Sequence, residues 1–262
     1  MCFIRVRQKS DPFFVLAFST RFGKILPMTL KSIDRNKLKG KIIAIDGPAG
    51  SGKSTTAKLV AERLGYVYLD TGAMYRALTY EAIKRNIGPS DSSALSAIAR
   101  ALPLRFEPSD GKNKVFIGTE EVTKQIRTPE ITRLVSEISA HADVRKAMVE
   151  KQKAIGKNGS IVAEGRDTTT VVFPYADLKI YMDASVTERA RRRVLDMKAM
   201  GIDTSIKEQV NEINRRDGLD SGRSHSPLKR ADDAVVIDTT NLTIEDQVNR
   251  VIELLYELVN AK

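Results

Sequence analysis

Eight consecutive residues early in this chain place two glycines, a lysine and a serine at fixed spacing. They fill every position of the pattern G-x-x-x-x-G-K-[ST], and they are Gly47, Pro48, Ala49, Gly50, Ser51, Gly52, Lys53 and Ser54. Glycines let the backbone curl so that its N-H groups point at phosphate oxygens. The pattern therefore predicts a phosphate-cradling loop for a nucleoside triphosphate, the P-loop.

Each residue at the end of the pattern has a defined chemical use. The Lys53 amine should reach the β- and γ-phosphates, and the Ser54 hydroxyl should ligate Mg²⁺. Thr55 follows at the start of the next helix, so we include it among the residues that bind the triphosphate. ATP and Mg²⁺ are the expected cofactors.

The flanking residues supply the elements that this loop requires. Residues 41–46 form an apolar run typical of a buried strand, and residues 55–64 place alanines, a valine and a leucine on one helical face. Strand-like runs follow at residues 66–70, 160–164, 178–183 and 235–238, and a helical pattern closes the chain. This alternation predicts an α/β protein with three layers and a central parallel sheet.

Two regions interrupt the alternation. Strand-like runs at 104–107 and 114–117 flank the turn sequence at 109–113, which predicts a β-hairpin within an inserted subdomain at 100–150. Residues 188–223 form two strongly charged helical stretches separated at 200–203, and we expect a helical lid there.

The formal net charge of +10 is concentrated at one end of the chain. Residues 1–40 hold nine lysines and arginines against two aspartates, so +7 of that charge lies there. We therefore divide the chain into a basic extension at 1–40 and a domain at 41–262. Two alternatives stay open for the extension: translation beginning at Met28, or a targeting or interaction arm.

Cysteine and histidine are scarce. Cys2 is the only cysteine and there are two histidines, so internal disulfides are excluded and a Cys/His metal centre is disfavoured. No segment is long and apolar enough to span a membrane. We expect a cytoplasmic protein without a membrane or nucleic-acid partner.

Arginine is the residue that suggests a second phosphate, because its planar fork pairs with phosphate oxygens and stays charged. The candidates lie where we expect loops at the ends of strands. They are Arg76, Arg127, Arg145, Arg166, Arg189, Arg193, Arg216 and Arg223.

Five further motifs carry a resemblance to a known family. In chain order they are D-T-G-A-M-Y-R at 70–76, Q-I-R-T at 125–128, E-G-R-D at 164–167, V-V-F-P at 171–174 and R-D-x-x-D-x-x-R at 216–223. In this order they resemble the motifs of bacterial cytidylate kinases, from about residue 41 to the C-terminus. The resemblance implies a P-loop kinase fold with a monophosphate-binding insert and a lid. It also implies ATP-dependent phosphorylation of CMP and dCMP by a monomeric enzyme.

The resemblance also implies roles for individual residues. Thr71 and Arg76 should contact the acceptor phosphate, with Arg127 and Arg166 adding contacts to it. Asp167 should orient groups or metal-bound water beside the phosphates. The remaining assignments are Ser136 and Arg145 near the cytosine ring, Arg216, Asp220 and Arg223 in the late motif with Asp220 on the ribose hydroxyls, and Arg189 and Arg193 in the lid over ATP. Lys53, Arg166, Asp167 and Arg193 are the expected catalytic residues.

One residue departs from the family pattern, and two other functions stay open. The family usually has glycine where this chain has Thr169, and a β-branched residue would be strained there if φ were positive. A kinase of the same fold could act on AMP, UMP or shikimate instead. The basic extension also leaves open a nucleic-acid-binding protein, although the charge lies outside the motif-bearing domain.

Overall fold

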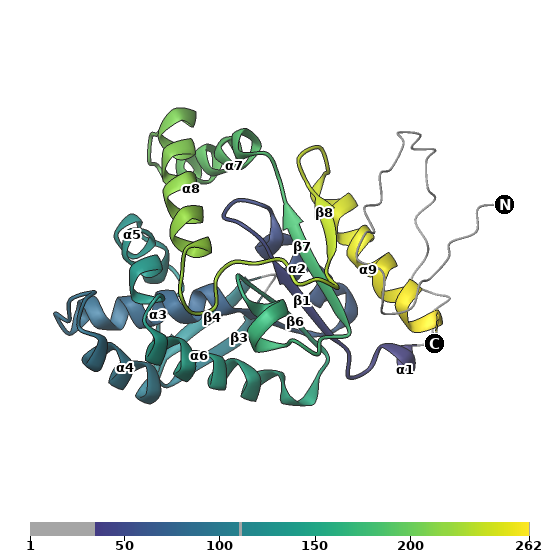
Figure 1. Ribbon diagram of the computed structural model, residues 1–262, viewed down its shortest axis with the longest axis horizontal. Coiled ribbons are helices and arrows are strands. Elements are labelled where there is room, and N and C mark those ends of the chain that lie inside the picture. The colour runs from purple at the N-terminus through teal and green to yellow at the C-terminus, as the bar shows by residue number, and fades with distance from the viewer. Residues whose placement is uncertain (1–34, 110–111, 262) are drawn as a thin grey trace. The chain divides into compact units, whose positions relative to one another are not determined.

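The computed structural model describes residues 35–109 and 112–261, and within them a parallel sheet forms the centre (Figure 1). Its strands are arranged in the order β2-β6-β1-β7-β8. Strand β1 (Ile42–Asp46) is buried along its whole length, as expected for a central strand covered on both faces. Its neighbours β6 (Ile161–Gly165) and β7 (Leu178–Asp183) both run parallel to it. The predicted three-layer α/β fold is confirmed.

Parallel pairing brings the carboxyl ends of the strands to one edge of the sheet. Asp46 lies opposite Gly165 on β6, and Asp70, at the end of β2 (Val67–Asp70), lies opposite Glu164. Ligands of open parallel sheets bind beyond this edge. The P-loop leaves β1 here, so the fold places it beside the charged residues that end the neighbouring strands.

Helices cover both faces of the sheet. On one face a continuous apolar core joins Ile42 and Ala44 of β1 to the helices α3 (Thr71–Lys84), α4 (Ser92–Ala101) and α6 (Ala142–Ile155). On the other face the Thr56 hydroxyl of α2 (Lys53–Leu64) donates to Gln247 of α9 (Ile244–Asn260) at 2.8 Å. Figure 1 shows α9 and α6 on opposite sides of the strands.

The predicted hairpin is present, although its strands are longer than expected. Strand β3 (Leu104–Ser109) pairs antiparallel with β4 (Lys112–Ile117), and β5 (Glu120–Glu121) adds a short third strand. The cross-strand ladder continues through Ser109 and Lys112, so most of the predicted turn at 109–113 is strand. Residues 110 and 111 of that turn lie outside the described residues.

The predicted lid region forms a pair of packed helices, α7 (Val186–Ala199) and α8 (Ile206–Ser221), at the top of Figure 1. Ser185 caps α7, and a reciprocal capping box between Ser205 and Glu208 begins α8. Arg189 and Ala190 are the residues of α7 that are buried. A helix with so little buried surface suits an element that moves, and closure of this pair stays a prediction.

The other described elements connect these layers. They are α1 (Arg35–Leu38), α5 (Pro129–Ile138), β8 (Val235–Asp238), two 3₁₀ turns η2 (Gln125–Arg127) and η3 (Gly156–Asn158), and the π-helical turn η4 (Thr168–Val172). Of the helices that the structure describes, none has the length and apolar character to cross a membrane. The predicted extension at 1–40 falls almost entirely outside the described residues.

Candidate active site

The P-loop geometry follows from its glycines. Gly50 and Gly52 have φ of +79° and +89°, in the left-handed region that side chains with a Cβ avoid. At Gly47 a Cβ would lie 2.0 Å from the Met182 carbonyl oxygen of β7, so only glycine fits. The loop ends on Gly52, which caps α2, and the helix therefore points its free N-H groups toward the phosphate position.

Lys53 is buried in a positively charged neighbourhood. Its Nζ donates to the Pro48 carbonyl at 3.1 Å, and the side chain is almost inaccessible to solvent. The pKa of the Lys53 amine falls to about 7, mainly because the side chain is buried and also because the charge of Arg166 lies nearby, while the charge of Glu164 opposes the shift. A lysine held in this way gains a full charge when anionic oxygens replace the missing solvent.

Glu164, near the end of β6, has no role in the sequence interpretation, yet it lies beside Ser54, the predicted metal ligand. The Ser54 hydroxyl donates to Glu164 Oε1 at 2.7 Å, so the two oxygens face the same space beside Lys53. Burial raises the pKa of the Glu164 carboxyl, which has little solvent around it. A hydroxyl and a carboxylate are the hard oxygen ligands that Mg²⁺ prefers, so these residues fit the ion.

Arginines gather next to this position without enough acid to neutralise them. The pKa of Arg216 falls to about 9 through burial and the charges of Arg166 and Arg76. The pKa of Arg76 falls to about 10, again mainly through burial, and the charges of Arg127 and Arg193 contribute. The Arg216 Nε is buried without a hydrogen-bond partner. Like charges held this close indicate a site for a ligand with several negative charges.

Most of these arginines do not lie on loops, so that part of the sequence interpretation is wrong. Arg76 lies in α3, Arg145 in α6, Arg189 and Arg193 in α7, and Arg216 in α8. Arg166 alone directly follows a strand of the main sheet. The inward faces of helices point the long side chains over the sheet edge, and rigid helices position charged groups better than loops.

A second polar cluster lies deeper, around Arg145. Its guanidinium pairs with Asp167, donates to the Ser139 carbonyl at 3.1 Å and lies 5.2 Å from the centre of the Tyr75 ring. Arg145 and Asp167 are both buried, and Ser136 lies in the same helix-turn segment as Ser139. The structure thus joins Asp167 to Arg145 and not to the Ser54–Glu164 pair, where its predicted metal-water role would place it.

Asp220 links the phosphate side of the site to this cluster. Its carboxylate accepts from Arg166 Nε at 2.7 Å and from Arg223, and Arg216 lies 3.9 Å away. Arg223 also donates to the Ser139 hydroxyl at 3.0 Å. Both Asp220 oxygens already accept from arginines, so a ribose hydroxyl would share this network.

Thr71 and Arg127 lie at the entrance to the arginine cluster. The Thr71 hydroxyl donates to the Glu164 carbonyl at 2.8 Å, which leaves its lone pairs available. Arg127 is half exposed and pairs with Asp70 at 3.3 Å. Asp70 also caps α3 by accepting from the Ala73 amide. Thr55, the third residue of α2, is exposed next to the P-loop.

The two lid arginines differ in position. Arg189 is buried and donates to the Ala49 carbonyl of the P-loop at 3.1 Å and to Asp217 at 2.5 Å, so it fastens α7 to the loop and to α8. Arg193 has no hydrogen bond or ion pair with the part of the chain that the structure describes, and its charge acts on Arg76 and Arg216. Arg192, given no role from the sequence, contacts the Thr239 carbonyl at 2.6 Å.

The backbone at Thr169 accommodates a residue other than glycine. Its φ is not positive, so the β-branched side chain is unstrained, and its hydroxyl and amide both donate to Asp46. Asp46 was also missed from the sequence. The available signal was an acidic residue at the end of β1, Asp46, and another near the end of β6, Glu164, because strand ends meet at the ligand edge of a parallel sheet.

The site combines a glycine-rich loop that leads into a buried lysine, two oxygen groups that fit Mg²⁺, and an excess of arginine at the carboxyl edge of a parallel sheet. These features define a P-loop phosphotransferase. The family model for cytidylate kinase matches residues 43–257. Cytidylate kinase from Ligilactobacillus salivarius is 51% identical over 215 residues, 82% of this chain and 96% of that protein. Cytidylate kinase from Geobacter sulfurreducens is 46% identical over 223 residues, 85% of this chain and 96% of that protein.

The chain therefore belongs to the cytidylate kinase family. It is an enzyme of the nucleoside monophosphate kinase class, which uses ATP as the phosphate donor. The identity extends over four fifths of the chain and nearly all of each relative. The family resemblance inferred from five short motifs is confirmed.

Proposed function

We propose that this kinase transfers the γ-phosphate of ATP to CMP and dCMP in one in-line step, with Mg²⁺ and without a covalent intermediate on the protein. The family membership supports the acceptor. The structural observation that carries the reaction is the excess of buried arginine facing Lys53, since two phosphate-bearing ligands would neutralise it. We keep the monomeric state and the cytoplasmic location as predictions.

The donor side is the P-loop. Its backbone N-H groups and the N-terminus of α2 bind the triphosphate, Lys53 contacts the β- and γ-phosphates, and Thr55 completes the loop. The oxygens of Ser54 and Glu164 would hold Mg²⁺. The ion, when bound, neutralises charge on the β- and γ-phosphate oxygens.

The acceptor side has a phosphate part and a nucleoside part. Thr71, Arg76, Arg127 and Arg166 bind the monophosphate. Arg145 and Ser136 recognise the cytosine ring, because an arginine can donate to its O2 and N3 acceptors, and Asp167 holds that arginine in place. Arg216, Asp220 and Arg223 bind the ribose side of the acceptor through the network around Asp220.

Charge stabilisation and alignment do the chemistry. Lys53 and Arg166, whose charges act on one another, would both stabilise the transferred group, and Arg193 would approach it when α7 and α8 close. The acceptor phosphate oxygen attacks the γ-phosphorus, the bond to the ADP oxygen breaks, and ADP leaves. Closure also excludes water that would otherwise hydrolyse ATP.

The test is ATP-dependent ADP formation with CMP, dCMP, UMP, AMP and GMP supplied separately. We expect strong turnover with CMP and dCMP and weak turnover with the others, because a base that leaves the Arg145 donors unpaired is rejected. The matched variant is Arg145→Met, which should reduce turnover with CMP selectively. Turnover with AMP or UMP in preference to CMP, or with none of the five despite ATP binding, would refute the proposed acceptor.

A further inference from the structure

Asp46 is a fully buried carboxylate that no cation neutralises among the residues described. Its Oδ1 accepts from the Thr168 amide at 2.9 Å and from the Thr168 hydroxyl at 2.7 Å. Its Oδ2 accepts from the Thr169 amide at 2.7 Å and from the Thr169 hydroxyl at 2.6 Å. Burial raises the pKa of the Asp46 carboxyl, and these donors oppose that shift.

The hydrogen bonds between Asp46 and the two threonines join two functional segments of the chain. Asp46 is the residue before Gly47, where the P-loop begins. Thr168 is the residue after Asp167, where the acceptor segment Arg166–Asp167 ends. One carboxylate therefore connects the loop that holds the donor to the turn that holds the acceptor residues, across the β1–β6 pairing.

The turn on the far side of the carboxylate is itself well fixed. In η4 the amides of Val171 and Val172 donate to the Asp167 carbonyl at 2.9 and 3.2 Å, and Phe173 donates to the Thr168 carbonyl at 2.8 Å. The Phe173 side chain is fully buried. Because this turn is rigid, the position of Asp46 determines the position of Asp167.

We propose that Asp46, Thr168 and Thr169 form a clamp that sets the distance between the P-loop and the Arg166–Asp167 segment, and that the two threonines are positioning residues for phosphoryl transfer. The inference rests on the proposed function for its kinetic test. A glycine, usual in the family at position 169, offers only its amide, so the fourth donor of the clamp belongs to the side chain of this chain's own threonine.

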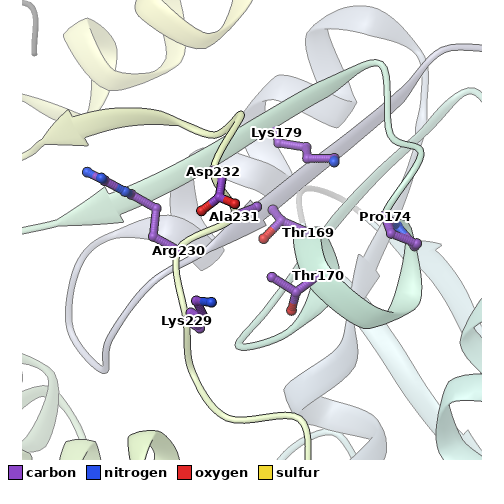
Figure 2. A pocket seen from close by; sticks show the side chains of 8 residues that line it. All are labelled: Thr169, Thr170, Pro174, Lys179, Lys229, Arg230, Ala231 and Asp232. Carbon is purple, nitrogen blue, oxygen red and sulfur yellow. The ribbon is translucent and has the colours of Figure 1, made fainter. Parts of the chain in front are cut away.

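Thr170 provides a matched control on the same turn. Figure 2 shows Thr169 and Thr170 together among the residues that line a cavity of about 310 Å³. Thr170 makes no hydrogen bond to Asp46, and it has no place in the proposed catalytic or binding machinery. Replacing either threonine by valine removes one hydroxyl and keeps the shape of the side chain.

The experiment measures kcat, KM for ATP, KM for CMP and Tm for Thr169→Val, Thr169→Ser, Thr168→Val and Thr170→Val. We expect Thr169→Val and Thr168→Val to lower kcat by about 10- to 100-fold at saturating substrates, since small misplacements of reacting groups have effects of this size. Both KM values should change less than about twofold. Thr169→Ser should recover most of kcat, and Thr170→Val should match the unaltered protein.

A second measurement makes the clamp testable independently of the acceptor. Hydrogen–deuterium exchange of the free protein should be faster at the P-loop in Thr169→Val than in Thr170→Val, because the loop loses its anchor. A lower Tm with unchanged kcat and unchanged P-loop exchange would overturn the inference and leave Asp46 a purely structural group. If CMP turnover were absent in the unaltered protein, the proposed function would fail while the exchange comparison still decided the clamp.

Discussion

At the scale of single residues, the site holds more buried positive charge than its carboxylates neutralise. Lys53, Arg76 and Arg216 all have lowered pKa values because they are buried together, and the buried Nε atoms of Arg145, Arg216 and Arg223 have no hydrogen-bond partner. Burying like charges opposes folding. Binding of two anionic nucleotides would reduce the repulsion between these like charges. Part of the free energy of binding would therefore come from the loss of that repulsion.

Lys53 should take up a proton when ATP binds. Its folded pKa of about 7 lies below the ordinary value, so above pH 7 the amine is mostly neutral in the free protein. Phosphate oxygens would raise that pKa again. We expect ATP binding at pH 8 to take up as much as about one proton, since the phosphates themselves are already deprotonated there. Calorimetric titration in buffers of different ionisation enthalpy measures the uptake.

The control for this titration is Lys53→Arg. An arginine stays charged throughout, so the variant should bind ATP without the proton uptake that belongs to this position. Equal uptake by both proteins would assign the proton to another group and contradict the lowered pKa of Lys53.

The Arg145–Asp167 pair gives a prediction about stability. Both side chains are buried, so Arg145→Met leaves an uncompensated carboxylate and should lower the free energy of unfolding by about 3–5 kcal/mol. The double variant Arg145→Met with Asp167→Asn removes that charge and should recover part of the loss. Urea denaturation measures both values. A strictly additive double variant would mean that the two side chains do not interact in solution.

At the scale of elements, α7 combines an anchored end with a free charge. Arg189 ties the first turn of the helix to the P-loop carbonyl of Ala49 and to Asp217 of α8. Arg193 lies one turn further on, and its charge acts on Arg76 and Arg216 of the arginine cluster as well as on the carboxylates of Asp196 and Glu212. Because the anchor is at one end, motion of α7 and α8 would change the position of Arg193 most.

Arg193→Ala should therefore lower kcat by about 10²-fold or more, since removing one electrostatic contact to the transition state has effects of this size. The matched control on the same helix is Arg191→Ala. Arg191 is mainly exposed and pairs with Glu188, whose pKa it lowers to about 2 together with Arg192. Steady-state kinetics with saturating ATP and CMP decide the comparison. Similar losses in both variants would point to a general effect on the helix.

At the scale of the whole molecule, the kinase fold and the excess of charge belong to different parts of the chain. The family model begins at residue 43, whereas residues 1–40 carry most of the net charge of +10. A chain beginning at Met28 lacks five basic residues and one aspartate, which lowers the net charge to +6. Catalysis and any binding to nucleic acid should therefore be separable.

We expect the shortened chain to keep kcat/KM for CMP within about twofold, because every proposed site residue lies at position 46 or beyond. Any salt-sensitive RNA binding by the full chain should weaken, since phosphate contacts dominate such binding. Parallel kinase and RNA-binding assays on the two chains test this. A large loss of kinase activity on shortening would give the extension a part in the fold or the site.

The sequence by itself determined what depends on neighbouring residues. The P-loop, the strands beside it and the hairpin were all predicted, because glycine conformations and strand periodicity are set within a few residues. The order of five motifs was also sufficient to indicate the family.

Only the tertiary structure decided which charged groups meet. Asp46 contacts Thr168 and Thr169 from more than 120 positions away, and Glu164 reaches Ser54 across 110. The arginines come together from α3, α7, α8 and the end of β6. Their spacing in the sequence therefore does not show which of them lie close to one another. These contacts form because β1 lies between β6 and β7 in the sheet. The packing of elements that are distant in sequence, and not the neighbouring residues, decides which side chains come into contact at the edge of the sheet.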